Sequence, residues 1–135
     1  MKIKTKKDFI YSNFINKDII LVDIDRFRYI NHEFGNKIGD LVINLFQEKL
    51  ILIFGFENVF RFTGNEYLIF VEQKDIFNKL KKFNKEIKNT SFPKLINIKF
   101  SYSIEHYNPF DSFESQYKSL KDKIYEIKSK KIYKS

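Results

Sequence analysis

The sequence predicts one α+β domain with a central antiparallel sheet and helices mainly on one face. Short β-rich apolar runs alternate with longer segments of helical periodicity. A Gly-containing turn between two such runs indicates an antiparallel hairpin. The length of 135 residues suits one core, so we take 1–135 as a single domain with a short lead-in at 1–17.

The N-terminal half predicts an arm, a strand and two helices. Met1 to Lys7 is basic and is expected to be a flexible arm, and Asp8 to Asn16 a short capping helix. Ile19 to Val22 is typical of a buried strand. We expect a loop and short helix over 26–34 and a full helix over 37–52. The apolar stripe of this full helix consists of Val42, Leu45, Phe46 and Leu50.

The middle of the chain predicts a β-hairpin. Val59 to Phe62 and Tyr67 to Val71 are apolar β-formers on either side of a turn at Thr63 to Asn65. We expect its Gly64-Asn65 pair to accept the positive φ of a hairpin turn. Glu66 then lies beside the turn.

The C-terminal half predicts a helix, a strand and a helix. The segment 74–89 is amphipathic, and 96–104 alternates apolar and polar residues as a half-buried strand does. Apolar residues then step by four and three from Phe113 to Ile127, which predicts a closing helix. The resulting order β, α, α, β, β, α, β, α is that of a ferredoxin-like palm.

Composition limits the partners that we expect. The chain has no cysteine, which excludes disulfides and thiolate metal sites and is compatible with a cytoplasmic location. No apolar run is long enough for a bilayer, so we expect no membrane partner. The formal net charge of +8 favours anionic partners, but nearly all the basic residues are lysines. We favour a solvated basic surface over a nucleic-acid surface.

The end of the first strand carries two carboxylates. Asp23 and Asp25 share one side of the strand, with Ile24 on the other, because side chains alternate with a period of two. Carboxylate oxygens at such a position suit hard cations such as Mg²⁺. If the hairpin pairs with this strand, Asn65 and Glu66 converge on the same edge.

Several spaced motifs follow one another along the chain. They are Asp23-Ile24-Asp25-Arg26-Phe27, Asn31, Phe34-Gly35, Gly39-Asp40 and Arg61-Phe62-Thr63-Gly64-Asn65-Glu66-Tyr67. In their order and spacing they resemble the GGDEF family of nucleotidyl cyclases. The segment from Leu120 to Lys131 resembles a lysine-rich version of that family's closing helix. The short lead-in is similar to that of minimal CRISPR polymerases.

The resemblance implies a set of site residues. Asp23, Asn65 and Glu66 take the catalytic positions, and these three with the main chain of Ile24 take the positions that hold Mg²⁺ or Mn²⁺. The implied nucleotide-binding residues are Ile24, Asp25, Phe27, Asn31, Asp40, Gly64 and Lys128. Asn31 and Asp40 match the guanine-reading positions, whereas resemblance to the CRISPR-like group implies a product with adenine, so the implied substrate is GTP, ATP or both.

Two residues depart from the family pattern. Asn65 replaces a carboxylate with a neutral amide, which binds Mg²⁺ more weakly. Thr63 adds a β-branched side chain in place of a glycine where phosphates are expected to approach. These departures leave open whether the domain is catalytically active.

Three site interpretations have simpler alternatives. Asp25 is also suited to cap the following turn, and Asp40 to favour a helix start, with Gly39 only a turn. Glu66 is also suited to a solvated hairpin position. His32 and His106 have no partner pattern, and we expect both to be ordinary surface or core residues.

The sequence is compatible with two functions. The first is an enzyme that joins two purine nucleoside triphosphates into a cyclic dinucleotide, as a homodimer that forms at least transiently. The second is an inactive domain that senses a purine nucleotide or a cyclic dinucleotide. A nucleic-acid binder rests on charge alone, and we do not expect it.

Overall fold

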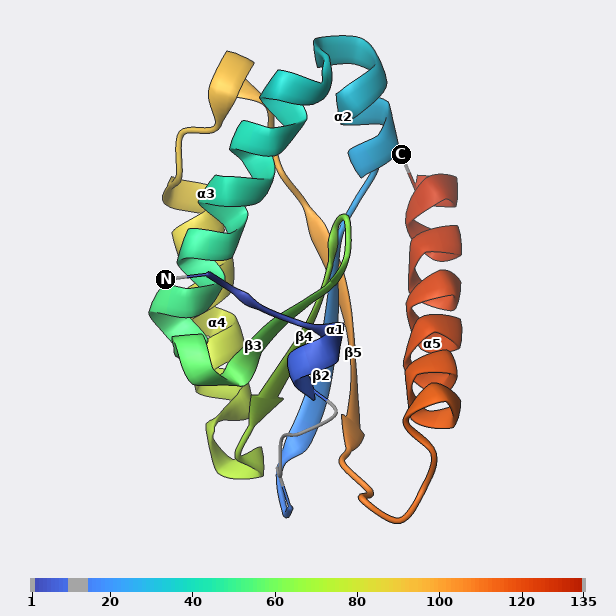
Figure 1. The fold of residues 1–135 in the computed structure, drawn as a ribbon. Helices are drawn as coiled ribbons and strands as arrows, with labels where there is room; N and C mark the ends of the chain where they lie inside the picture. The colour runs from blue at the N-terminus through green and yellow to red at the C-terminus, as the bar shows by residue number, and fades with distance from the viewer. Residues whose placement is uncertain (1, 10–14, 135) are drawn as a thin grey trace.

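The computed structural model describes residues 2–9 and 15–134. Five strands form one sheet in the spatial order β1-β3-β4-β2-β5 (Figure 1). Their bounds are β1 (Lys4–Thr5), β2 (Asp18–Ile24), β3 (Val59–Thr63), β4 (Glu66–Val71) and β5 (Phe100–His106). β1 pairs parallel with β3, and the other neighbours are antiparallel, so the sheet is mixed.

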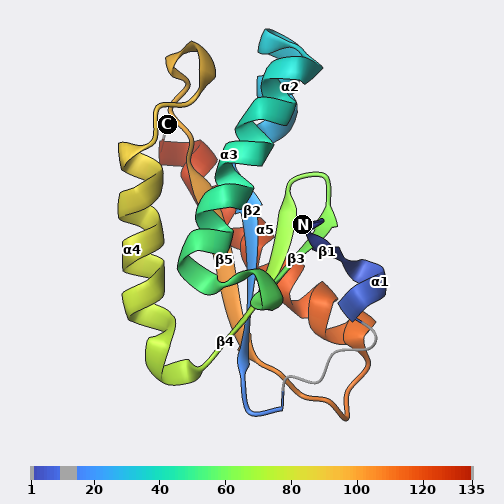
Figure 2. The same cartoon turned by 60° about the vertical axis from the view of Figure 1, so that its left-hand side comes forward.

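Helices cover both faces of this sheet. Their bounds are α1 (Lys6–Phe9), α2 (Phe27–Phe34), α3 (Asn36–Phe54), α4 (Ile76–Asn89) and α5 (Phe113–Lys134), with 3₁₀ turns at Phe56–Asn58, Gln73–Asp75 and Pro93–Leu95. α3 and α4 pack side by side on one face, and α5 lies alone on the other (Figures 1 and 2). The predicted α+β palm is confirmed, with α5 as the helix that covers the second face.

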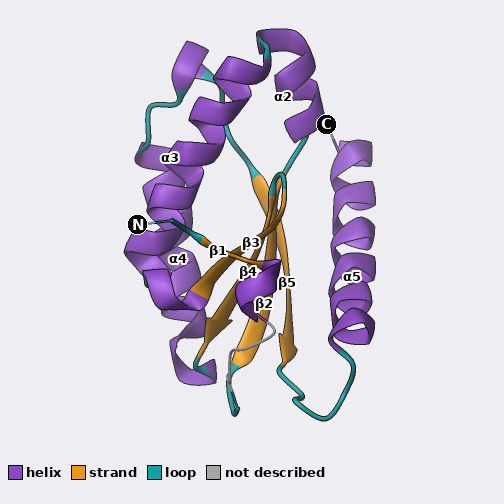
Figure 3. Ribbon diagram, in the orientation of Figure 1, coloured by secondary structure: helices purple, strands orange, loops and turns teal. Residues whose placement is uncertain are grey.

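The protein has two hydrophobic cores, one on each face of the sheet, and the side chains of β2 alternate between them. Ile20, Val22 and Ile24 point to the core beneath α3 and α4. Ile19 and Leu21 point to a smaller core beneath α5. A central strand that is buried on both faces reads as a continuous apolar run, as this one does. Figure 3 shows the three layers, with helices on both sides of the strands.

The hairpin between β3 and β4 differs from the prediction in its turn. Neither Gly64 nor Asn65 has a positive φ, so the prediction of a positive φ at this pair is wrong. The ladder instead shifts register between Arg61 and Thr63, which accommodates the connection as a bulge does. The Arg61 guanidinium donates to the Gly64 carbonyl oxygen at 3.2 and 2.7 Å and braces the turn.

The other differences lie at the ends of elements. The lead-in contains the short strand β1, which the expected flexible arm missed, and the expected helix at 8–16 is seen only as α1 up to Phe9, since 10–14 lie outside the described residues. β5 begins at Phe100 rather than at Ile96. None of the described helices is long and apolar enough to cross a membrane.

Candidate functional site

The end of β2, the hairpin turn and the C-terminal half of α5 lie at the same end of the sheet (Figure 1). Asp23 is paired with Glu66 across the β2–β4 ladder. The Asn65 side-chain nitrogen donates to Asp23 Oδ1 and lies 3.3 Å from the Ile24 carbonyl oxygen. The structure thus brings together the residues that hairpin pairing predicts at one edge. We call Asp23, Asp25 and Glu66 the carboxylate cluster.

Three lysines of α5 face this carboxylate cluster. Their spacing of seven and three residues places them on one side of the helix. The pairs are Lys121 Nζ with Glu66 Oε2 at 3.2 Å, Lys128 Nζ with Asp23 Oδ2 at 2.7 Å, and Lys131 Nζ with Asp25 Oδ2 at 2.9 Å. Each carboxylate therefore has its own ammonium partner. We call these three residues the lysine row.

The surroundings of Asp23 disfavour the ionised form of its carboxyl group. It is only 9% exposed, and burial raises the pKa of its carboxyl above the usual value. The hydrogen bond and charge of Lys128 offset part of this effect, while the charges of Glu66 and Asp25 add to it. A buried carboxylate with a raised pKa and a specific partner is typical of functional sites.

The surroundings of Glu66 favour the ionised form of its carboxyl group. Burial alone would raise the pKa of its carboxyl, but hydrogen bonds from Thr63 and Tyr117, together with Lys121, outweigh burial and lower it. Thr63 Oγ1 and the Tyr117 hydroxyl both donate to Glu66 Oε1 at 2.6 Å. Burial and this bond to Glu66 in turn raise the pKa of Tyr117. At 5% exposure Glu66 is not a solvated hairpin residue, so that alternative is wrong.

Asp25 contacts β5 rather than the start of α2. Ser101 Oγ donates to Asp25 Oδ1 at 2.6 Å, and α2 has no side-chain cap, so the capping alternative is wrong. Sequence reasoning missed Ser101, Tyr117 and Lys121 as partners of the carboxylate cluster. The seven-residue spacing from Lys121 to Lys128 was a signal that could have found the lysine row.

Asn31 and Gly39 contact each other where α2 packs against α3. A Cβ atom built on Gly39 would lie 1.7 Å from Asn31 Oδ1 and 3.5 Å from Phe27 Cζ. The Asn31 side chain therefore rests against helix α3 at a position that only glycine permits. Gly39 is buried inside α3 rather than in a turn, and Asp40 is exposed beyond the first helical turn, so the helix-start alternative is wrong.

The two histidines take no part in this arrangement. His32 is exposed on α2. His106 Nδ1 lies 2.8 Å from Asp18 Oδ1, and its side chain is 64% exposed. Both are surface residues, in agreement with the sequence-based expectation.

The oxygens around Asp23 suit a hard divalent cation. Asp23 contributes a carboxylate and Ile24 a main-chain carbonyl, which are ligand types for Mg²⁺ and Mn²⁺, whereas Asn65 directs its amide nitrogen toward both of these groups. The Asn65 amide nitrogen and the Lys128 ammonium, which carry partial or full positive charge, contact the two Asp23 oxygens. Within residues 2–9 and 15–134, no group of three or more His, Cys, Asp or Glu is placed to hold a metal. Both Asp23 oxygens are thus occupied by hydrogen-bond donors, and both donors would have to move away for a cation to bind Asp23.

We expect substitutions of Glu66 and of Asp23 to differ in their effect on the free energy of unfolding, because the pKa values of the two carboxyls are shifted in opposite directions. We expect Glu66→Gln to lower the free energy of unfolding at pH 7 by about 1–3 kcal/mol, because it weakens hydrogen bonds to a charged acceptor. The folded-state pKa of Glu66 is below its ordinary value of 4.5, so its contribution is present above that pH and is lost as the pH falls through the folded-state pKa. The loss in the variant should therefore shrink in acid.

Asp23→Asn is the matched comparison. Because the folded-state pKa of Asp23 is raised, its ionised form opposes folding at neutral pH, and we expect no loss of stability in this variant. Urea denaturation of both variants, followed by circular dichroism from about pH 3 to pH 7, measures the contrast. Equal losses at pH 7 would contradict it.

Comparison with known proteins places this chain in a family. Residues 15–132 match the family model described as "Diguanylate cyclase, GGDEF domain". The diguanylate cyclase DgcZ of Escherichia coli K12 is 36% identical over 59 residues, which are 43% of this chain and 20% of that protein. The chain thus spans a fifth of this curated relative.

Solved structures share the fold. The active GGEEF domain of a diguanylate cyclase from Vibrio cholerae has a TM-score of 0.69 at 20% identity, over 84% of this chain and 77% of that one. The GGDEF domain of DgcB from Caulobacter crescentus, solved in complex with c-di-GMP, has a TM-score of 0.72 at 19% identity, over 84% and 72%. The chain belongs to the GGDEF family of diguanylate cyclase domains.

Proposed function

We propose that this domain is a nucleotidyl cyclase that condenses two purine nucleoside triphosphates into a cyclic dinucleotide, with Mg²⁺ or Mn²⁺ as cofactor. The observation that carries the proposal is the convergence of Asp23, the Ile24 carbonyl and Asn65 beside Lys128. Membership of the GGDEF family supports the reaction class. The c-di-GMP in the DgcB structure supports a guanine product.

The phosphates would lie between the start of α2 and the hairpin turn. Arg26 has a φ of 56°, which turns the chain sharply from β2 into α2. The first N–H groups of a helix have no acceptor within the helix, and they favour anions. Gly64 leaves the facing side open, since nothing lies within 4 Å of a Cβ built there. Lys128 then supplies an ammonium, and Asp25 and Phe27 frame the entry.

The base would be read by Asn31 and Asp40. An Asn amide both donates and accepts at a purine edge, and a carboxylate accepts from the N1 and N2 donors of guanine. Asn31 rests against Gly39, and Asp40 follows Gly39 in α3, so both residues lie where α2 meets α3. This pair favours guanine, so GTP is the first substrate to test and ATP the second.

The reaction needs two copies of the domain. A bound divalent cation would lower the pKa of the attacking 3′-hydroxyl and neutralise the leaving pyrophosphate. In each half-reaction the 3′-oxygen of one nucleotide forms a bond to the α-phosphorus of the other, and the bond to pyrophosphate breaks. Asp23 and Glu66 would hold negative charge beside the attacking hydroxyl while Lys128 holds phosphate. The proposed reaction therefore requires a homodimer that forms at least transiently.

A nucleotide sensor is the second candidate. Asn65 and Lys128 occupy both oxygens of Asp23 with hydrogen-bond donors, so the protein neutralises this carboxylate without a cation. Such a site can retain the purine pocket at Asn31 and Asp40 without chemistry. Binding of a purine nucleotide or cyclic dinucleotide would then serve to regulate a partner.

The test separates these two functions. The protein, Asp23→Ala and the control Asp122→Ala, an exposed residue of the same helix as the lysine row, are incubated with GTP or ATP and Mg²⁺ or Mn²⁺. Mass spectrometry of the products then follows. Cyclic product from the protein and the control, but not from Asp23→Ala, supports the cyclase. Nucleotide binding by calorimetry without product supports the sensor, and absence of both overturns both.

Gly39→Ala separates base binding from folding. The added methyl group would collide with Asn31 Oδ1 at 1.7 Å, so the Asn31 side chain must move. Alanine has a higher helix propensity than glycine by about 1 kcal/mol, so we expect no loss of stability. We expect the dissociation constant for GTP to rise roughly tenfold, as for the loss of one hydrogen-bonded contact. Calorimetry and thermal denaturation of the same sample measure both, and unchanged GTP affinity would contradict the role of Asn31.

A further inference from the structure

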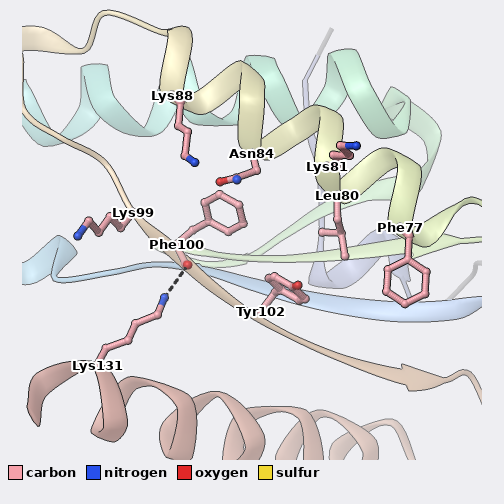
Figure 4. Close-up of a pocket in the computed structure, with 9 residues that line it drawn as sticks. All are labelled: Phe77, Leu80, Lys81, Asn84, Lys88, Lys99, Phe100, Tyr102 and Lys131. Atoms are coloured by element: carbon pink, nitrogen blue, oxygen red, sulfur yellow. Dashed lines mark hydrogen bonds between the residues drawn. The ribbon is translucent and has the colours of Figure 1, made fainter. Parts of the chain in front are cut away.

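A hollow of about 520 Å³ lies outside the candidate site, between α4 and the edge strand β5. We call it the α4–β5 hollow. Figure 4 shows side chains from α4 and β5 pointing toward one another across it, with Lys131 reaching the Phe100 carbonyl oxygen from α5, on the other side of β5. Its lining consists of Phe77, Leu80, Lys81, Asn84, Lys88, Lys99, Phe100, Tyr102 and Lys131.

The charge of the α4–β5 hollow is entirely positive. Four lysines line it and no acidic residue does. Lys131 bonds to Asp25, but among the described residues Lys81, Lys88 and Lys99 have no carboxylate partner. The lysine row, in contrast, is fully paired. Unpaired cations around a concave surface attract an anion.

Exposed aromatic rings line the same hollow. The Phe77 side chain on α4 is 85% exposed and Tyr102 on β5 is 40% exposed. Phe100 forms the floor, since its ring packs edge-on against buried Phe83 with centroids 4.9 Å apart. The exposed rings offer faces on which a planar ring can stack.

We propose that the α4–β5 hollow binds a nucleoside phosphate, with the base against Phe77 and Tyr102 and the phosphate on Lys81 and Lys88. The volume falls in the range of roughly 300–1,000 Å³ that is usual for small-ligand pockets. A base with a phosphate is the ligand chemistry that uses both the rings and the unpaired lysines. A single nucleotide matches a bounded hollow better than a long strand does.

This binding site is distinct from the proposed cyclase site. Lys131 alone is common to the lining of the hollow and the lysine row, where it donates to Asp25 Oδ2, the Phe100 carbonyl oxygen and Ser101 Oγ, each at 2.9 Å. A Lys131 variant would disturb both sites and is unsuitable as a test. Lys88 and Tyr102 line the hollow and belong to neither the lysine row nor the carboxylate cluster, so their substitution distinguishes the two sites.

The experiment uses 5′-GMP and 5′-AMP as probes. Calorimetry gives the dissociation constant, and NMR chemical-shift changes locate the bound nucleotide. We expect Tyr102→Ala to raise the dissociation constant at least about tenfold, as for the loss of one stacked base. We expect Lys88→Glu to raise it by at least about the same factor, because it puts a carboxylate beside the phosphate. The matched controls are Lys85→Glu on the same helix and Tyr125→Ala on α5, both outside the hollow, and we expect them to bind as the unmodified protein does.

The background Asn31→Ala keeps this test independent of the cyclase site. Retained binding in that background, with shifts at residues of the hollow, supports the proposal even if no cyclic product ever forms. Shifts confined to α2 and the start of α3, or binding that Tyr102→Ala leaves unchanged, would overturn it. If pyrophosphate alone binds as tightly as 5′-GMP and 5′-AMP, the hollow binds anions without recognising a base, and the nucleotide proposal is overturned. Tighter binding of a single-stranded RNA decamer, or a dimer lost on Phe77→Ala, would assign it to another partner.

Discussion

Replacing Asn65 by Asp raises the rate of cyclic dinucleotide formation by roughly 100-fold at limiting Mg²⁺, the scale of effects seen when the support of a metal site is altered. The proposed site has one firm carboxylate ligand, Asp23, and neutral oxygens beside it. A second carboxylate supplies negative charge to a hard cation that a neutral amide lacks. The Asn65 amide nitrogen also leaves Asp23 Oδ1, which frees that oxygen for the cation.

The same substitution predicts a change that does not depend on turnover. Without a cation, the new carboxylate faces buried Asp23, and two like charges at contact destabilise each other. We therefore expect the melting temperature of Asn65→Asp to fall below that of the unmodified protein in EDTA and to recover when Mg²⁺ is added. The unmodified protein, whose Asp23 already has Lys128 and Asn65 as partners, should respond little to Mg²⁺.

Asn97→Asp is the control, since it adds the same charge at an exposed position before β5. It should change neither the rate nor the response to Mg²⁺. If Asn65→Asp binds Mg²⁺ by the thermal shift but yields no product, the sensor function gains support. If it shows no thermal shift either, Asp23 and residue 65 do not form a metal site, and the metal part of the proposal fails.

Local pattern was sufficient for most of the fold. The run at 19–22 lies inside β2, and the stripe of Val42, Leu45, Phe46 and Leu50 lies on α3. Both signals are periodic burial, which depends only on which residues face a core. The hairpin pairing then followed from two β-rich runs that are close in sequence.

Features that depend on distant partners were not accessible in this way. β1 has two residues, and its parallel pairing with β3 joins segments more than fifty positions apart, as Lys4 with Phe60 shows. The hairpin turn also escaped prediction, because a register shift and the Arg61 side chain shape it, rather than a positive φ at Gly64. Such contacts exist only after the chain has folded.

The same contrast between local pattern and distant contacts applies to the site residues. Asp23, Asn65 and Glu66 could be placed together because strand pairing fixes their positions. The lysine row could not be assigned to individual carboxylates, since the register of α5 against the sheet is set by the packing of Leu120 and Ile124 into the smaller core. Thr63 was interpreted as an obstacle to phosphate, whereas the structure also gives it a hydrogen bond to Glu66.

Phe46→Ala lowers the free energy of unfolding by about 3–5 kcal/mol, as is usual when a buried aromatic ring is removed. The Phe46 side chain is fully buried, and its ring lies 5.2 Å from that of Phe83, 6.0 Å from that of Phe100 and 6.1 Å from that of Tyr67, measured between centroids. Domains of this size are stable by only about 5–15 kcal/mol, so the loss is a large share of the total. Urea denaturation followed by far-UV circular dichroism measures it, since the chain has no tryptophan.

Phe77→Ala is the control of identical chemistry, because the Phe77 side chain is 85% exposed. We expect it to change the free energy of unfolding by less than about 0.5 kcal/mol. A loss comparable to that of Phe46→Ala would mean that Phe77 packs into the protein in solution, and the open α4–β5 hollow would then not exist. The pair therefore tests the larger core and the open state of the proposed nucleotide site together: a ring that costs nothing to remove from the folded protein is free to stack on a ligand.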